Sequence, residues 1–442
     1  MQSDKEESVV KKKCVRLLAG ALLVAALAAA PRGDAAGFSL YEQGARANAL
    51  GGAFVAQADD PSAMFFNPAG NAFNERFTIY GGAFLILRPT ADFTGGNPFP
   101  GPTSTASMKQ SAYWIGNGYG VLPLKPGSIN LAVGFWTPAG LGVPWENPDS
   151  FSGRFISQRV DIRQVALSAQ ISAKLADWIA IGAGPEIRLS DVKLSQNAGA
   201  LNPFTNRFTD VGHLSLISEG TPVKWTWNAG LLIKPCDRLR LGVSYHGHVN
   251  FDYSGNATLY QIGTGYPQFD AAVAAKYPMN KPLPGSTTLQ FPALLTFGVS
   301  YDLSPTLTVN VDANYTYWDV FDQTTITIQG LPTKHIEHGW ENTWTIRGGL
   351  GWQASKNVWV GGGFVYDTTP QPDSDVGPLL PDANRTGVSI GAGFQLSHMF
   401  RLELSSLFLW FHERTTSTNE ANFNGTYNLF AILPGISIKS TF

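Results

Sequence analysis

The chain is poor in charge, in cysteine and, beyond its N-terminus, in long apolar runs. Only 14% of its 442 residues are charged, against about 25% in an ordinary soluble domain. Two cysteines, one of them at position 14, are too few for a disulfide-stapled secreted scaffold. After residue 36 no stretch approaches the roughly 18 continuous apolar residues of a membrane-spanning helix. What the chain has instead is 47 glycines and 12% aromatic residues.

Residues 1–35 have the pattern of a signal peptide that is removed. Residues 11–13 and Arg16 form a positive region, and residues 17–30 form an apolar run too short to span a bilayer. Gly33-Asp34-Ala35 offers small residues for cleavage before Ala36. An uncleaved N-terminal anchor is the alternative.

The charge balance of the remaining chain excludes a nucleic-acid partner. Removing residues 1–35 takes away six of the 31 Lys and Arg and four of the 33 Asp and Glu, which leaves 25 against 29 and a net charge of −4. Nucleic-acid binding would need a basic face.

Two-residue periodicity is the strongest structural signal. Between residues 239 and 251 the odd positions are mostly apolar and the even positions mostly polar, so that His246 and His248 are expected to share a polar face. The fourteen such runs lie at about 77–88, 110–121, 128–138, 159–174, 178–193, 221–235, 238–252, 286–302, 305–319, 340–354, 357–367, 385–397, 399–413 and 429–442.

The connections between these runs alternate between tight turns and long loops. This alternation, with an even strand number and a C-terminal Phe442, is typical of an outer-membrane barrel. A soluble two-sheet sandwich is the alternative, but Trp344 and Trp410 near strand ends favour interfacial belts. We therefore predict an all-β fold: a transmembrane antiparallel β-barrel of 14 strands over residues 77–442.

Residues 36–76 are expected to form a hatch inside this barrel. Residues 37–70 are rich in Gly and Ala, are too short for a domain, and end in the turn signature Asn67-Pro68-Ala69-Gly70. A segment of this kind needs a cavity to sit in.

Several motifs give the chain a family resemblance. The chain resembles the FadL family of long-chain fatty acid transporters in five places. They are the segment from Gly37-Phe38 to Asn67-Pro68-Ala69-Gly70, then Gly153-Arg154, Lys234-Pro235, Leu289-Gln290-Phe291-Pro292 and residues 380–385. The resemblance implies capture of a hydrophobic substrate in outer loops, a pocket near the hatch with Phe38 among its ligand-binding residues, and sideways release at a kinked third strand. It also implies a monomer in the outer membrane of a Gram-negative bacterium, in contact with membrane lipid, inserted by the barrel assembly machinery and without a cofactor. Some relatives carry aromatic hydrocarbons instead.

The third strand contains candidates for the sideways opening. Pro138 lacks a backbone donor and Gly140 weakens pairing, so Pro138, Ala139 and Gly140 predict a bulge or gap. The alternative is that Pro138 merely ends the strand at its rim.

Two further ligand contacts are predicted. Phe269 and Val273 share one face of a short helix in the longest loop, which could receive an apolar ligand or simply cap the barrel mouth. Arg188, beside Glu186 on a polar strand face, could bind a carboxylate head group, although lumen charges usually pair among themselves.

No motif indicates an enzyme or a metal site. His246 with His248, and His335 with His338, lack the HExxH arrangement, and there is no G-x-S-x-G. The function expected is transport of long-chain fatty acids or similar compounds; the alternatives are an aromatic or alkane hydrocarbon channel, a general porin or an adhesin.

Overall fold

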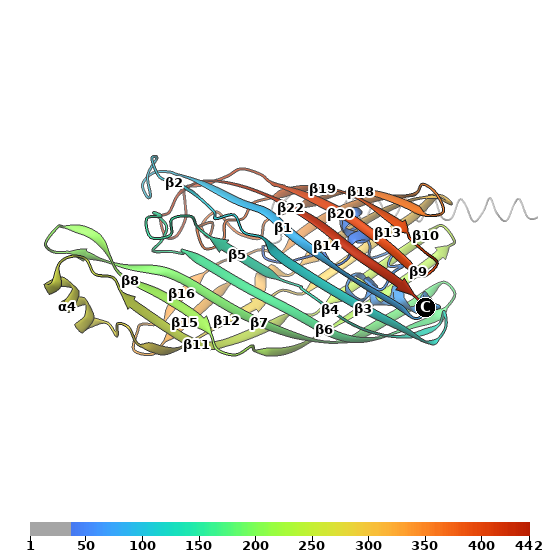
Figure 1. Cartoon of the computed structure of the whole chain (residues 1–442), viewed down its shortest axis with the longest axis horizontal. Coiled ribbons are helices and arrows are strands. Elements are labelled where there is room, and N and C mark those ends of the chain that lie inside the picture. The colour runs from blue at the N-terminus through green and yellow to red at the C-terminus, as the bar shows by residue number, and fades with distance from the viewer. Residues whose placement is uncertain (1–36) are drawn as a thin grey trace, which may run out of the picture.

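The chain forms a closed barrel of fourteen antiparallel wall strands (Figure 1). The structure, a computed structural model, describes residues 37–442, apart from the side chains of residues 88 and 89; the predicted signal peptide lies outside this range. In ring order the wall strands are β1 (Thr78–Gly95), β3 (Tyr113–Lys125), β4 (Ile129–Trp136), β6 (Arg159–Ala176), β7 (Ile179–Asn202), β9 (Val223–Cys236), β10 (Leu239–His246), β13 (Leu294–Ser304), β14 (Leu307–Thr316), β17 (Thr343–Gln353), β18 (Val358–Asp367), β19 (Arg385–Gln395), β20 (Phe400–Phe411) and β22 (Gly425–Thr441). Pairing of β22 with β1, from Thr78↔Thr441 onward, closes the ring.

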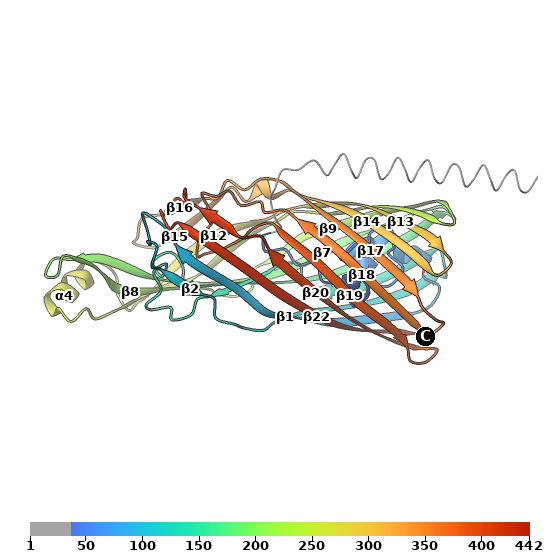
Figure 2. The same cartoon turned by 90° about the horizontal axis from the view of Figure 1, so that it is seen from above.

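The two ends of the barrel differ. At the turn end, where the C-terminus lies, connections between wall strands are only two to four residues long. At the loop end the wall continues into shorter strands and an arm tipped by a helix (Figure 2). These elements are β2 (Thr105–Ser107), β5 (Gly140–Pro144), β8 (Arg207–Ser218), β11 (Val249–Gln261), α4 (Pro267–Lys276), β12 (Pro282–Phe291), η2 (Trp318–Val320), β15 (Gln323–Ile328), β16 (Lys334–Glu337) and β21 (Arg414–Thr416). Much of what the sequence presented as long loops is therefore paired strand.

Alternation along the wall strands separates a lipid face from a lumen face. On β6, Val165, Leu167 and Ile171 are 42–55% exposed on the outside, while Ser168 and Gln170 are buried in the lumen. Closure of the ladder gives most backbone amides a partner, as an apolar surrounding requires. Within residues 37–442, no helix has the length and apolar content needed to cross a membrane.

The alternation does not run unbroken from β10 into β11. His246 is buried and His248 is exposed, so the prediction that they share a face is wrong. The two intervening residues between β10 and β11 reverse the phase, and Val249 and Phe251 point into the lumen. Across the sheet, Pro292 and Ala293 interrupt β12 and β13 at the matching level, with His246↔Leu294 below and Val249↔Phe291 above.

The hatch fills the lumen toward the turn end with α2 (Ala45–Ala49), α3 (Ala63–Phe66) and η1 (Pro68–Phe73) (Figure 1). The Asn67 side chain donates to the backbone carbonyls of Val55 and, on the wall strand β9, Leu231, and it accepts from the Ala69 amide. Gly230 of β9 faces this turn; a Cβ there would lie 2.0 Å from Asn67 Oδ1. Glycine on the wall therefore lets the hatch turn approach the sheet closely.

A second contact fixes the middle of the hatch. The carboxylate of Asp312, on β14, accepts hydrogen bonds from the backbone amides of Phe54 (2.7 Å) and Val55 (2.9 Å). Gly51 and Gly52, with φ of 69° and 81°, shape the preceding turn, which packs on the wall backbone at Gly363. These positions require glycine because of both the left-handed φ and the close approach.

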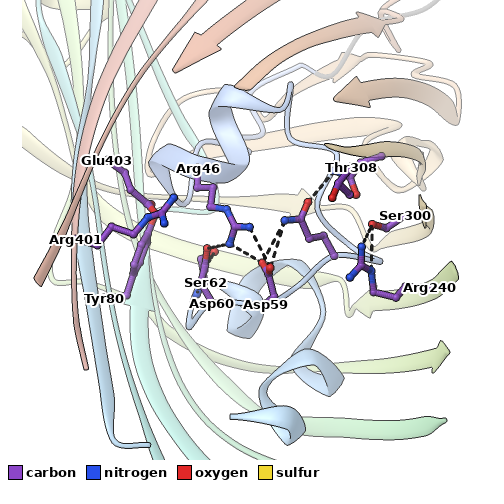
Figure 3. A network of polar contacts seen from close by, with 12 residues as sticks. Arg46, Asp59, Asp60, Ser62, Tyr80, Arg240, Ser300, Thr308, Arg401 and Glu403 are labelled. Atoms are coloured by element: carbon purple, nitrogen blue, oxygen red, sulfur yellow. Dashed lines mark hydrogen bonds and ion pairs between the residues drawn. The ribbon is translucent and has the colours of Figure 1, made fainter. Parts of the chain in front are cut away.

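Charged residues join two parts of the hatch to each other, close to a polar pair of the wall (Figure 3). Arg46 pairs with Asp59 at 2.7 Å and approaches Asp60 at 3.9 Å, while Tyr80 of β1 donates to Glu403 of β20 at 2.9 Å. Burial, together with the nearby Glu403 carboxylate, raises the pKa of Asp60 to about 6. The hatch is thus held by polar contacts that depend on geometry and, at Asp60, on protonation.

Candidate functional site

Phe38, at the start of the hatch, sits in an aromatic box within the lumen. Its ring centroid lies 5.2 Å from Phe291, 5.0 Å from Trp318, 5.5 Å from Phe321 and 5.8 Å from Trp340. These rings come from β12, from η2 with the residue that follows it, and from the segment before β17. Edge-to-face contacts of this kind favour a defined ring orientation.

A lower cavity of about 590 Å³ lies between the hatch and the wall. This volume is in the range of small-molecule sites. Its lining is mostly apolar with a few charged groups, and includes Phe38, Leu40, Tyr41, Glu42, Ile86, Tyr113, Ile115, Ala139, Leu141, Ile162, Arg163, Arg347, Arg385, Leu409, Phe411 and Leu433.

An upper cavity of about 420 Å³ lies toward the loop end. It is lined by Phe38, Leu141, Phe155, Val160, Ile162, Val192, Leu194, Leu216, Leu289, Phe321, Ile326, Trp340 and Leu380, among others. Phe38, Leu141 and Ile162 line both cavities, so Phe38 and its aromatic box stand at the junction between them.

Arg347 is the lumen cation best placed to meet a ligand in the lower cavity. Its guanidinium lies 4.0 Å from the centre of the Tyr41 ring, and Nη1 donates to the Gly51 carbonyl at 2.9 Å, while the buried Nε has no hydrogen-bond partner among residues 37–442. Arg385, which also lines the cavity, is held by Asp367 through Nε at 2.8 Å and Nη2 at 2.6 Å. Arg347 therefore has an N–H donor available for an anionic group, whereas two donors of Arg385 are already bound to Asp367.

The third strand is broken beside the lower cavity. β4 ends at Trp136 and the chain resumes pairing as β5 at Gly140, so Pro138 and Ala139 lie in the break. Above Gly118↔Phe135, the ladder between β3 and the third strand stops, and β5 pairs only with β6 among the described residues. Residues 113–117 of β3 therefore face an interval in the wall.

The start of the hatch seals the inner side of this interval. Leu40 N donates to Pro138 O at 3.0 Å, Gly140 N donates to Phe38 O at 3.1 Å, and Ser39 forms a bridge with Ala139. These bonds replace part of the missing ladder. Displacement of residues 38–40 would free the edge of the break.

Arg188 and the loop helix lie away from both described cavities. Arg188 forms a buried ion pair with Glu186, and neither lines the upper or the lower cavity. Phe269 and Val273 lie on the helix α4 that the sequence predicts. Both are buried against side chains of β8 and β11 at the tip of the arm. Sequence reasoning missed Arg347 and the aromatic box, since residues from separate strands meet only in three dimensions.

A polar group lines the upper cavity. His338 lies 3.1 Å from Asp375 through Nδ1 and 3.0 Å from Thr324 through Nε2, and Trp340 Nε1 donates to Asp375 at 2.7 Å. In the part of the chain that the structure describes, no three His, Cys, Asp or Glu side chains cluster so as to hold a metal ion.

Comparison with known proteins gives the fold and site a context. Residues 25–442 match the family model described as "Outer membrane protein transport protein (OMPP1/FadL/TodX)". The chain is 22% identical over 424 residues to the long-chain fatty acid transport protein of Escherichia coli O6:H1, covering 88% of this chain and 90% of the relative. It is 21% identical over 438 residues to outer membrane protein P1 of Haemophilus influenzae, covering 90% of each.

Solved structures share the fold. A Pseudomonas aeruginosa FadL homologue superposes with a TM-score of 0.79 at 21% identity, covering 92% of this chain and 100% of that one. The Pseudomonas putida toluene transporter TodX gives 0.69 at 17% identity, covering 91% and 99%. The family match over the whole described chain, together with the barrel and its filled lumen, shows that this protein belongs to the OMPP1/FadL/TodX family of outer-membrane transport proteins for hydrophobic compounds.

Proposed function

We propose that the substrate is a single-chain amphiphile with a carboxylate, a long-chain fatty acid first of all. The observation that carries this proposal is Arg347, whose buried Nε finds no partner in the described part of the chain and whose side chain lines an otherwise mainly apolar cavity. Charge-assisted hydrogen bonds to a carboxylate are roughly twice as strong as neutral ones, so an acid would use donor capacity that a hydrocarbon leaves unpaired.

The proposed path runs from the loop end to the membrane. The ligand enters the upper cavity, passes the Phe38 box into the lower cavity, and leaves between β3 and β5 at Pro138, Ala139 and Gly140. Each methylene moved from water into an apolar site gains about 0.8 kcal/mol, so release into water would be slow. Sideways exit into lipid exchanges one apolar surrounding for another and avoids that cost.

The head-group assignment is tested by binding of oleate and of toluene to purified Arg347→Gln protein. A lost charged hydrogen bond of about 1.5–3 kcal/mol corresponds to oleate binding weakened by about 10- to 150-fold. Toluene binding should stay within about twofold, since toluene has no group for Arg347 to bind. Equal losses for both ligands would contradict the assignment.

Arg188→Gln is the matched control, because Arg188 is also a buried lumen arginine but is paired with Glu186 outside both described cavities. The sequence-based hypothesis is that Arg188 binds the carboxylate head group. Comparison of Arg188→Gln with Arg347→Gln therefore distinguishes the two assignments. Loss of oleate binding in Arg188→Gln, with Arg347→Gln unaffected, would restore that hypothesis.

The exit is tested by restoring strand formers in the break. Pro138→Val combined with Gly140→Thr should favour continuous pairing of the third strand and lower fatty acid uptake at least fivefold, with binding retained. Uptake at the wild-type rate would instead indicate a route through the hatch. The heat stability of the folded barrel, judged by its migration on gels, controls for misfolding of the variant.

An aromatic hydrocarbon is the second candidate, favoured by the five rings of the box formed by Phe38, Phe291, Trp318, Phe321 and Trp340. A neutral ring would bind there without using Arg347. The oleate and toluene arms of the Arg347 experiment therefore also decide between the two substrates. We further propose that the protein acts as a monomer inserted by the barrel assembly machinery.

A further inference from the structure

A second interval in the wall lies between β9 and β11, away from the third strand. β9 pairs with β7 as far as Val223↔Leu189, and β11 pairs with β12 down to Val249↔Phe291. Within the described chain, however, no ladder joins residues 223–226 of β9 to residues 248–254. Single backbone bonds close the interval at its ends, from Gly247 N to Trp227 O and from Glu219 N to Ser254 O, each 2.9 Å.

The interval coincides with matched interruptions in the neighbouring strand pair. β11 and β12 keep one register with β10 and β13, but the ladder is interrupted at residues 247–248 and 292–293. Pro292 has no backbone donor, so it cannot continue a ladder through the kink. Beyond this interruption β11 stays paired with β12, but the edge of β11 forms no ladder with the described residues of β9.

Two side-chain latches stand where ladder hydrogen bonds are missing. Toward the lumen, the hydroxyl groups of Tyr253 and Ser190 lie 2.6 Å apart. Toward the outside, Lys224 Nζ lies 2.5 Å from Asp252 Oδ2, and the Asp252 side chain is 66% exposed. An exposed ion pair and one hydroxyl contact are weaker closures than a run of backbone bonds.

The interval has apolar side chains on its outside and at its upper end, whereas toward the lumen the buried Arg188 of β7 lies opposite Lys224. On the outside Trp225 and Trp227 are 67% and 52% exposed, as lipid-facing side chains of a wall strand are. At its upper end a small cavity of about 40 Å³ is lined by Tyr253 together with Val192 and Leu216, which also line the upper cavity. Between residues 223–226 and 248–254, side chains rather than ladder hydrogen bonds separate lipid from the lumen, and the small cavity at the upper end shares Val192 and Leu216 with the upper cavity.

We propose that this interval is a second lateral portal, through which single-chain amphiphiles already dissolved in the outer leaflet enter the upper cavity. The inference rests on the proposed function, since it supplies that function with substrate from the membrane as well as from water. Its direction follows from its position: it adjoins the cavity on the outer side of Phe38, whereas the third-strand break adjoins the cavity beyond Phe38.

The test uses the mature protein in liposomes that carry a diazirine-labelled fatty acid in the bilayer. A Lys224→Cys, Asp252→Cys disulfide in a Cys236→Ser background should lower photolabelling of the β12 peptide that contains Leu289 at least fivefold, and a reductant should restore it. In a parallel arm, the same probe is supplied from water to detergent-solubilised protein. It should label the disulfide-linked protein and the Cys236→Ser parent equally.

The two arms keep the inference and the proposed function distinguishable. Undiminished bilayer-borne labelling with the disulfide formed would overturn the portal while leaving the function intact. No labelling from either source would overturn both.

A second set of variants does not depend on disulfide formation. Tyr253→Phe combined with Lys224→Ala removes both latches and should raise the initial rate of bilayer-borne labelling at least twofold. Lys174→Ala is the control, because it removes an exposed ion pair, with Asp177, next to a turn. An unchanged rate in the unlatched variant, or an equal rise in the control, would count against the portal.

Discussion

Replacing Asp312 should release the hatch from the barrel wall in graded steps. The Asp312 Oδ2 atom accepts both the Phe54 and the Val55 amide, at 2.7 and 2.9 Å, and all three residues are buried. Asp312→Ala leaves two buried backbone donors unpaired. Asp312→Asn keeps a carbonyl oxygen that can accept them but removes the charge.

The size of each step follows from the bonds lost. Hydrogen bonds to a charged group contribute about 1.5–3 kcal/mol each, so Asp312→Ala should destabilise hatch docking by about 3–6 kcal/mol. Since neutral bonds are roughly half as strong, Asp312→Asn should cost about 1.5–3 kcal/mol. These values correspond to an undocked population raised by about 150- to 20,000-fold and about 10- to 150-fold, respectively.

Ion conductance in planar lipid bilayers measures the undocked population. Open events should increase in the order wild type, Asp312→Asn, Asp312→Ala. Asp302→Asn serves as the control, because Asp302 is a carboxylate of the wall strand β13 that binds Arg240 and Thr308 and forms no hydrogen bond with the described residues of the hatch. If Asp312→Ala conducts no more than the control, the hatch does not depend on this carboxylate, and its docking must be attributed elsewhere.

Three further outcomes are expected. The docked state raises the pKa of Asp60 to about 6, from near 4 when exposed, so hatch docking should be strongest below about pH 4 and weaken as the pH rises through 6. Ion conductance should therefore rise over this pH range, and Asp60→Asn should flatten the rise. An unchanged pH dependence in Asp60→Asn would contradict the prediction. Gly363→Val places a side chain against the Gly51 backbone and should destabilise docking by about 1–3 kcal/mol, whereas Gly348→Val, with open space beside it, should leave the conductance unchanged. Phe38→Ala removes the ring between the two cavities and should speed passage of a fluorescent fatty acid from water to lipid; slower passage would show that the ring guides the ligand rather than separating the cavities.

The barrel could be read from the sequence because its signal is local. Alternation on β6 and the short turns at one end each depend on neighbouring residues, and the fourteen strands and the α4 helix follow. The prediction about His246 and His248 is wrong because alternation was carried through Gly247, where the phase reverses. The signal that could have revealed it is Pro292, whose missing donor marks a kink in the strand paired with β10 and β11.

The candidate site could be read only in part because its contacts are non-local. Pro138 and Gly140 mark the third-strand break through their own chemistry, and Phe38 entered through the resemblance. Arg347 meets Gly51 across 296 positions of sequence, and no pattern within β17 distinguishes it from Arg188, which finds a partner two residues away. Pairing within one strand is visible in the sequence, but pairing across the lumen is not.

The positions of the two wall intervals bear on how transport could be directional. A complete ladder offers no sideways passage, and both intervals lie where proline and glycine interrupt pairing. The third-strand break borders the lower cavity, whereas the second interval reaches side chains of the upper cavity through the small cavity at Tyr253. For an acyl chain, movement from lipid into a cavity and back exchanges similar surroundings, so neither proposed step carries the cost of about 0.8 kcal/mol per methylene that water would impose. Net flow would then be set by removal of the ligand after it leaves through the third-strand break. Phe38 would separate this exit from entry through the portal between β9 and β11.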